Sequence, residues 1–172
     1  MSSRFSVLRL LLLAGSLGLA GCSHYHLGGG GTLAFHTLYV APVGNKTLLP
    51  QAVPLVSTTL REAFLRDGRV TVVGSPGEAD ATLTLTLTGY DREVATVRPG
   101  DTGLARTFTL TLGATATLHD NRSGRDLFTA RHVDAGRDAY TDSGQLQSEY
   151  QALPLLAEAL AKKVAHAALD VW

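Results

Sequence analysis

The chain has 172 residues with 15 basic and 15 acidic side chains, so its formal net charge is zero. This length suits one domain of ordinary size, and the balanced charge excludes a strongly basic protein that would attract nucleic acid over long range. The single cysteine excludes an intrachain disulfide and a zinc site built from several cysteines.

The N-terminal segment predicts export. Arg4 and Arg9 are the only charged residues before Cys22, and an apolar run from Leu10 to Gly21 separates them from the cysteine. A positive start, a short apolar stretch and small residues before a cleavage point are typical of a secretory signal peptide. So short a run cannot span a bilayer, which needs about 20 apolar residues. We therefore expect residues 1–21 to be removed, leaving a mature chain with more acidic than basic side chains.

The residues around Cys22 predict a lipid anchor. Leu19-Ala20-Gly21-Cys22 resembles the bacterial lipobox, in which the cysteine thiol accepts a lipid and becomes the first residue of the mature protein. The alternative is an ordinary signal peptide followed by a free cysteine. Ser23 follows the cysteine where an aspartate in many lipoproteins indicates the inner membrane, so we expect attachment to the outer membrane on its periplasmic side. More than one acyl chain makes such anchoring stable.

Residues 22–35 are expected to form a glycine-rich tether, because four glycines from Gly28 to Gly31 have no side chains to pack. His24 and His26 could bind a metal ion, but two ligands on a flexible segment make a poor site. We therefore expect no metal site and no cofactor other than the covalent lipid on Cys22.

Residues 36–172 are expected to form a single α+β domain. Its first half predicts a strand at 38–42, a helix from Pro54 to Asp67 that ends at Gly68, and a second strand at 70–73. Proline suits the start of a helix, where its missing N–H costs nothing.

Strict alternation of apolar residues with threonine predicts two half-buried strands at 81–88 and 107–118. A third strand at 127–133 follows a tight turn, and residues 91–106 and 134–147 are expected to be loops. The last helix is expected to run from near Glu149 to the C-terminus. Together these elements predict a two-layer sandwich, with two helices packed on one face of a mostly antiparallel sheet of four to five strands.

The threonines of the two alternating strands predict an outward face of hydroxyl groups. Charged residues are absent from 81–90 and 107–118, although exposed sheet faces usually carry charges that discourage aggregation. A neutral hydroxyl face suits contact with another protein, whereas the alternative is that threonine simply favours strands. The candidate partner-contacting residues are Thr82, Thr84, Thr86, Thr88, Thr107, Thr109 and Thr111.

No sequence motif indicates catalysis. The chain has no P-loop, no GxGxxG pattern after a strand, no HExxH, no GxSxG and no CxxC, and its six histidines are scattered. We therefore expect no catalytic residues and no enzymatic activity. A lipid-anchored hydrolase remains a third alternative without support from any motif.

Short motifs in a characteristic order resemble the LPS-assembly lipoprotein family (LptE-like). After the lipobox they are Tyr25-His26-Leu27, Leu38-Tyr39-Val40-Ala41-Pro42, Asn45-Lys46-Thr47, Leu60-Arg61-Glu62-Ala63-Phe64, Gly68-Arg69-Val70, Ala79-Asp80-Ala81 and Gly89-Tyr90. The resemblance covers nearly all of the mature chain. The chain departs from the family pattern in one extra residue after the lipidated cysteine and in its longer glycine run.

The resemblance implies a non-enzymatic protein that sits inside the LptD barrel of the outer membrane, plugs it, assists its assembly and binds lipopolysaccharide. Because lipopolysaccharide is anionic, Arg92, Arg98 and Arg106 are candidates to contact it. The alternative for these arginines is pairing with neighbouring acidic residues. The alternative for the whole chain is a periplasmic accessory lipoprotein of the CsgG/LpoB-like kind, which serves secretion or activates a cell-wall synthase.

Overall fold

The structure is a computed structural model that describes residues 33–98, 101–140 and 145–170; at 96–98, 101–106 and 145 only the backbone is described. From Leu33 onward the chain forms one compact unit. Its elements are β1 (Thr37–Val40), β2 (Gly44–Asn45), α2 (Ala52–Asp67), β3 (Thr71–Val73), the 3-10 helix η2 (Pro76–Glu78), β4 (Ala81–Arg98), β5 (Asp101–Asp120), β6 (Arg125–Tyr140) and α3 (Gln145–Leu169).

The strands form one six-stranded sheet in the order β3-β1-β4-β5-β6, with β2 pairing β4 beside β1. The pairs β1–β3, β1–β4 and β2–β4 are parallel, whereas β4–β5 and β5–β6 are antiparallel. The predicted α+β class is confirmed. The sheet is mixed rather than mostly antiparallel, because α2 connects β1 to β3 as a crossover and returns the chain in the same direction.

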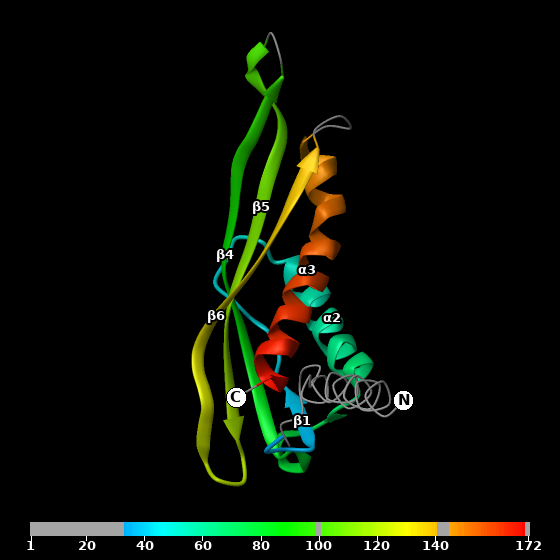
Figure 1. Cartoon of the computed structure of the whole chain (residues 1–172), viewed down its shortest axis with the longest axis vertical. Coiled ribbons are helices and arrows are strands. Elements are labelled where there is room, and N and C mark those ends of the chain that lie inside the picture. The colour runs from blue at the N-terminus through cyan, green and yellow to red at the C-terminus, as the bar shows by residue number, and fades with distance from the viewer. Residues whose placement is uncertain (1–32, 99–100, 141–144, 171–172) are drawn as a thin grey trace, which may run out of the picture. The chain divides into compact units, whose positions relative to one another are not determined.

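Both helices pack on one face of the sheet (Figure 1). The buried side chains of that face alternate along β4 and β5, and the helices contribute matching apolar stripes. The largest fully buried side chains include Leu38, Leu83, Leu85, Leu87, Leu110, Leu112, Leu118, Leu60, Phe64, Leu156 and Leu160. This packing forms a single hydrophobic core between the sheet and the two helices.

The predicted end of α2 is confirmed at Gly68, where φ is +74° and the backbone N–H donates to the carbonyl of Phe64. Glycine adopts this left-handed conformation without steric cost, so it ends the helix. The helix begins at Ala52, two residues before the predicted start. Pro54 therefore lies inside the first turn, where its missing N–H is still tolerated.

Two predicted loops are strands in the structure. Residues 91–98 and 101–106 extend β4 and β5 into one long hairpin, because Asp91 pairs with Thr111 and Glu93 with Thr109. Residues 134–140 complete β6, in which Asp138 pairs with Thr109. Charged residues in these segments break the apolar alternation, but an antiparallel partner satisfies their backbone groups whatever the side chains are.

The last helix begins at Gln145, earlier than the predicted start near Glu149. Pro154 consequently lies within the helix rather than in its first turn. Proline at this position cannot donate the backbone hydrogen bond that would reach back to Tyr150. Its side chain is exposed, so α3 still buries Ala152, Leu153 and Leu156 against the sheet.

Candidate partner-binding face

The sheet face opposite the helices carries two rows of threonines that we call the hydroxyl face. It consists of Thr82, Thr84, Thr86 and Thr88 on β4 and Thr109, Thr111, Thr115 and Thr117 on β5. The register places Thr84 opposite Thr117 and Thr86 opposite Thr115, so hydroxyl groups line up across the strands. Every member is exposed or half-buried, in contrast to the fully buried leucines that alternate with them.

Six of the seven threonines predicted to face outward belong to the hydroxyl face. The seventh, Thr107, lies on the same side of β5 opposite Tyr140, and only 6% of its surface is exposed. A β-bulge between Leu87 and Gly89 inserts one extra residue into β4, so its covered side changes from odd-numbered residues up to Leu87 to even-numbered residues from Tyr90, while the alternation of β5 is unchanged.

Carboxylates that the sequence pattern does not reveal border the hydroxyl face. Asp91 and Glu93 lie on β4 and Asp134 and Asp138 on β6, and all four are exposed. The register pairs Asp91 with Thr111 and Asp138 with Thr109, so these side chains share the threonine side of the sheet. Within the described residues, β4, β5 and β6 direct no lysine or arginine to this face.

Threonine hydroxyls on this side bind neighbouring polar groups. Thr109 Oγ1 donates to Asp138 Oδ1 at 2.9 Å, and Thr117 Oγ1 accepts from the backbone N–H of Ala130 at 3.0 Å. Ala130 has φ of +48°, an unusual conformation for a residue with a side chain. The bond from its N–H to Thr117 stabilises the bulged backbone of β6 at this point.

Glycine allows a close backbone approach at the border of the hydroxyl face. Gly44 of β2 pairs with Thr86, and a Cβ added at Gly44 would meet Thr86 Oγ1 at 3.0 Å. That separation is shorter than ordinary packing permits, so a larger residue at position 44 would displace Thr86 or β2.

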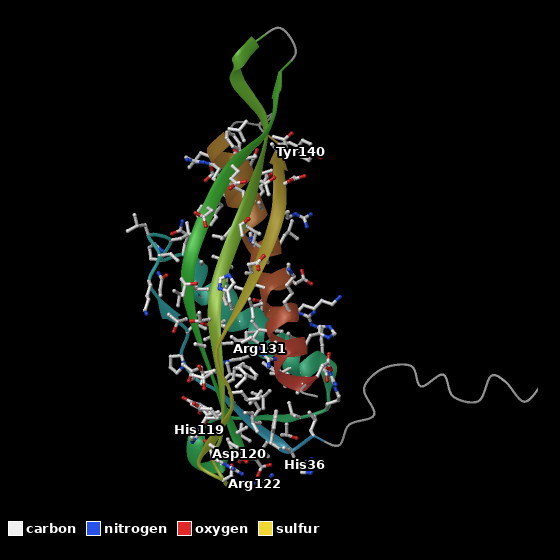
Figure 2. The ribbon with its side chains drawn as sticks, turned by 60° about the vertical axis from the view of Figure 1, so that its left-hand side comes forward. His36, His119, Asp120, Arg122, Arg131 and Tyr140 are labelled. Carbon is white, nitrogen blue, oxygen red and sulfur yellow. The ribbon has the colours of Figure 1, made fainter. Side chains whose placement is uncertain are left out.

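One end of the sheet is held by Asp80. Its Oδ2 accepts backbone N–H bonds from His36 at 2.8 Å and Thr37 at 3.0 Å, and its own N–H donates to Thr37 Oγ1. The bonds from His36 and Thr37 lower the pKa of the Asp80 carboxyl below its usual range. Arg122 lies 3.6 Å from Asp80, and Figure 2 shows His36 and Arg122 at this same end.

His119 and Asp126 form a second polar pair at this end, on neighbouring strands. His119 Nδ1 lies 2.7 Å from Asp126 Oδ1, and Thr129 Oγ1 donates to the other carboxylate oxygen. The bonds from His119 and then Thr129 lower the pKa of Asp126. Both side chains remain substantially exposed, so this pair is a surface feature that borders the hydroxyl face.

Arg92 lies on the helix side of β4, away from the hydroxyl face. Its guanidinium pairs with Glu149 of α3, and its Cζ lies 5.7 Å from the ring centre of Phe108. Tyr90 also donates to Glu149 at 3.5 Å. Arg92 therefore ties the stem of the long hairpin to α3, and its charge is already balanced by a carboxylate.

The remaining predicted site residues are described only in part or not at all. Cys22 lies outside the described residues. The backbones of Arg98 and Arg106 belong to β4 and β5, but their side chains are not described. Among the described helices, none is long and apolar enough to cross a membrane. Over the same residues, no group of three or more His, Cys, Asp or Glu side chains could hold a metal ion.

Comparison with known families finds one whose model matches most of the chain. The family is described as LptE, lipopolysaccharide-assembly, and the match covers residues 35–167. This range includes every described helix and strand except the last two residues of α3. Comparison with curated proteins finds no match.

Solved structures of similar fold include bacterial lipoproteins. A protein from Xanthomonas campestris is 12% identical with a TM-score of 0.61, over 80% of this chain and 85% of its own. A minor lipoprotein from Acinetobacter baumannii is 16% identical with a TM-score of 0.52, over 79% and 94%. The PelC dodecamer from Paraburkholderia phytofirmans is 18% identical with a TM-score of 0.51, over 84% and 96%. At such identities the likeness concerns the fold alone.

Proposed function

Because the chain belongs to the LptE lipopolysaccharide-assembly family, we propose that it is an outer-membrane lipoprotein that partners the LptD barrel. In this proposal Cys22 carries the lipid anchor on the periplasmic side of the membrane. The folded unit occupies the barrel lumen as a plug and assembly partner, and the complex delivers lipopolysaccharide to the cell surface. The family is one of non-enzymatic lipoproteins.

The uncovered hydroxyl face is the observation that supports a protein partner best. One face of the sheet is covered by two helices, while the other exposes threonines from Thr82 to Thr88 on β4 and from Thr109 to Thr117 on β5. Threonine hydroxyls lose little on leaving water when they find hydrogen-bond partners, whereas lysine or arginine would have to be desolvated. A barrel wall offers backbone and side-chain groups that can satisfy such a face.

The structure distinguishes Arg92 from the other two arginines that are candidates to contact lipopolysaccharide. Arg92 already pairs with Glu149, so binding an anionic lipid there would have to displace that carboxylate. Arg98 and Arg106 lie in the part of the hairpin beyond Tyr140, where β5 has β4 as its only strand partner among the described pairings. We therefore place the lipopolysaccharide contacts at Arg98 and Arg106 ahead of Arg92.

Co-purification tests this proposal. The tagged full-length protein, extracted from outer membranes in mild detergent, should retain an outer-membrane barrel protein in one-to-one ratio. Its depletion should lower the lipopolysaccharide exposed at the cell surface. Recovery of a cell-wall synthase instead, with surface lipopolysaccharide unchanged, would overturn the proposal.

The fold likeness to the PelC dodecamer keeps one alternative open to the same experiment. An accessory lipoprotein of the CsgG/LpoB-like kind would be recovered as a ring of identical copies or with a secretion or synthase partner. The mass of the detergent-extracted complex distinguishes such a ring from a one-to-one complex with a barrel.

A further inference from the structure

The two long edges of the sheet differ in how their backbone groups are satisfied. On β6, Lys163 Nζ donates to the carbonyl of Asp134 at 2.8 Å, and Ser148 donates to the carbonyl of Tyr140. Side chains of α3 therefore cap the β6 edge, which is a common protection of edge strands. The other long edge belongs to β4 beyond Thr88, and in the described part of the chain no side chain caps its backbone groups.

The first part of the β4 edge is occupied by short parallel strands. β1 pairs with Ala81–Leu83 and β2 with Thr86 and Leu87. Backbone N–H groups of Ala41 and Lys46 donate to the carbonyls of Leu83 and Leu87, each at 2.9 Å. From Thr88 onward, β5 is the only strand that pairs with β4 in the described part of the chain.

The register shows which backbone groups point to the unoccupied edge. The backbone C=O groups of Leu83 and Leu87 point away from β5. The extra residue at the Thr88 bulge then exchanges the two sets, so that even-numbered residues of β4 point away from β5. Beyond the bulge the N–H and C=O groups of Tyr90, Arg92 and Val94 therefore point to the edge. Among the described residues, no hydrogen bond reaches these backbone groups.

Exposed apolar side chains flank this edge on the helix side. A shallow pocket of 60 Å³ is lined by Leu49, Tyr90, Leu146, Tyr150 and Leu153, together with Gln51 and Glu149. Leu146 is 82% exposed, Tyr150 74% and Val94 58%, although such residues are usually covered. Figure 1 shows the β4–β5 ribbon continuing past the start of α3. Tyr90 and Arg92 lie beside that start, where both side chains contact Glu149.

Acidic side chains flank the same edge on the opposite side of the sheet. Asp91 and Glu93 are exposed and alternate with the edge-directed Tyr90, Arg92 and Val94. A strand added here would place every second side chain beside Asp91 and Glu93, where opposite charge is favourable. Its other side chains would lie against Val94, Tyr150 and Leu146, where apolar groups are favourable.

We propose that the β4 edge from Tyr90 to Val94 binds an extended segment of another polypeptide, which adds to the sheet as a strand. Backbone hydrogen bonds provide the attachment, and the two flanks select a segment in which basic and apolar residues alternate. The β1 and β2 pairings show that the same edge already accepts strands further down. This inference does not depend on the proposed partnership with a barrel.

Binding of two labelled synthetic peptides to the full-length protein in detergent tests the proposal. Thr-Lys-Val-Lys-Val-Lys-Thr should bind about tenfold more tightly than Thr-Glu-Val-Glu-Val-Glu-Thr, as measured by fluorescence anisotropy. The lysine peptide should also slow amide hydrogen exchange at Tyr90, Arg92 and Val94, whose N–H groups have no hydrogen-bond partner among the described residues. Equal binding of both peptides, or unchanged exchange at these amides, would overturn the proposal.

Two variants and one control locate the binding to this edge. Asp91→Lys with Glu93→Lys should reverse the preference between the peptides, whereas Asp134→Lys with Asp138→Lys on β6, which β5 separates from the β4 edge, should leave the lysine peptide the tighter binder. Val94→Pro removes one edge N–H without removing a bond to β5, and it should weaken both peptides. If the proline variant fails to fold, the two charge-reversal variants still test the assignment. Loss of the preference for the lysine peptide in the β6 variant, with the preference retained in the β4 variant, would overturn the assignment to β4.

Discussion

The two faces of β4 and β5 are built from the same alternating residues but meet different surroundings. Leu83, Leu85 and Leu112 are fully buried beneath the helices, whereas Thr84, Thr86 and Thr111 between them remain accessible. One face thus stabilises the domain and the other is available to a partner. A substitution on the first face should affect folding, and one on the second should affect association.

The largest expected effect is on the covered face. Leu112→Ala leaves a cavity in the core, because Leu112 is 0% exposed, and it should lower the free energy of unfolding by about 2–5 kcal/mol. The neighbouring Thr111→Ala on the hydroxyl face should change it by less than about 0.5 kcal/mol. Urea unfolding followed by circular dichroism measures both. Equal losses of unfolding free energy in the two variants would contradict the division between a folding face and a binding face.

Lysine on the hydroxyl face should disrupt association while preserving the fold. Thr84→Lys with Thr86→Lys would bury two unpaired charges against a partner, and we expect about a hundredfold loss of affinity for the barrel. Thr58→Lys on the exposed side of α2 is the matched control and should bind normally. Quantitative co-purification measures the difference, and all variants should melt within a few degrees of the wild type. Undiminished recovery of the barrel with the double variant would count against this face.

The ion pair between the hairpin stem and α3 should contribute less to the free energy of unfolding than a core leucine does. Arg92 pairs with Glu149, with 44% and 17% of their side chains exposed. Partly exposed ion pairs typically contribute about 0.2–1 kcal/mol. A double-mutant cycle with Arg92→Met and Glu149→Gln, measured by urea unfolding, should give a coupling energy in this range. A coupling near zero would show that the Arg92–Glu149 pair does not stabilise the contact between the hairpin stem and α3.

The smallest effect concerns pH. The pKa of Asp80 is lowered by the backbone N–H groups of His36 and Thr37, so the folded state favours the ionised carboxylate. That contribution is fully present above the unfolded pKa of about 4 and is lost as the pH falls through the lower folded pKa. The Asp80→Asn variant lacks this stabilisation by an ionised carboxylate. The difference in melting temperature between wild type and variant should therefore become smaller from pH 7 to pH 3. A difference that stays constant would exclude this linkage.

The sequence predicted the elements whose side chains alternate regularly. Leucine and threonine between Ala81 and Thr88 identify a half-buried strand, and Gly68 identifies the end of α2, because each follows from local chemistry. The outer parts of β4, β5 and β6 were predicted as loops. Their residues are charged or small, and their strand structure comes from pairing between segments of the hairpins, which periodicity does not reveal.

The candidate site was predicted only in part for the same reason. The threonines are local to two strands and could be recognised, whereas Asp134 and Asp138 join them only through the pairing of β6 with β5. The pairing of Arg92 with Glu149 spans 57 residues, so the sequence alone suggested nearer acidic partners. Contacts between distant segments required the fold.

Site-specific photocrosslinking in living cells tests the central claim most directly, which is that the hydroxyl face meets the barrel wall. A photoreactive residue at Thr84 or Thr115 should form a crosslink to an LptD-like barrel, while the same residue at Thr58 on α2 should form much less. Crosslinks to the barrel from Thr58, with none from Thr84 and Thr115, would contradict the account.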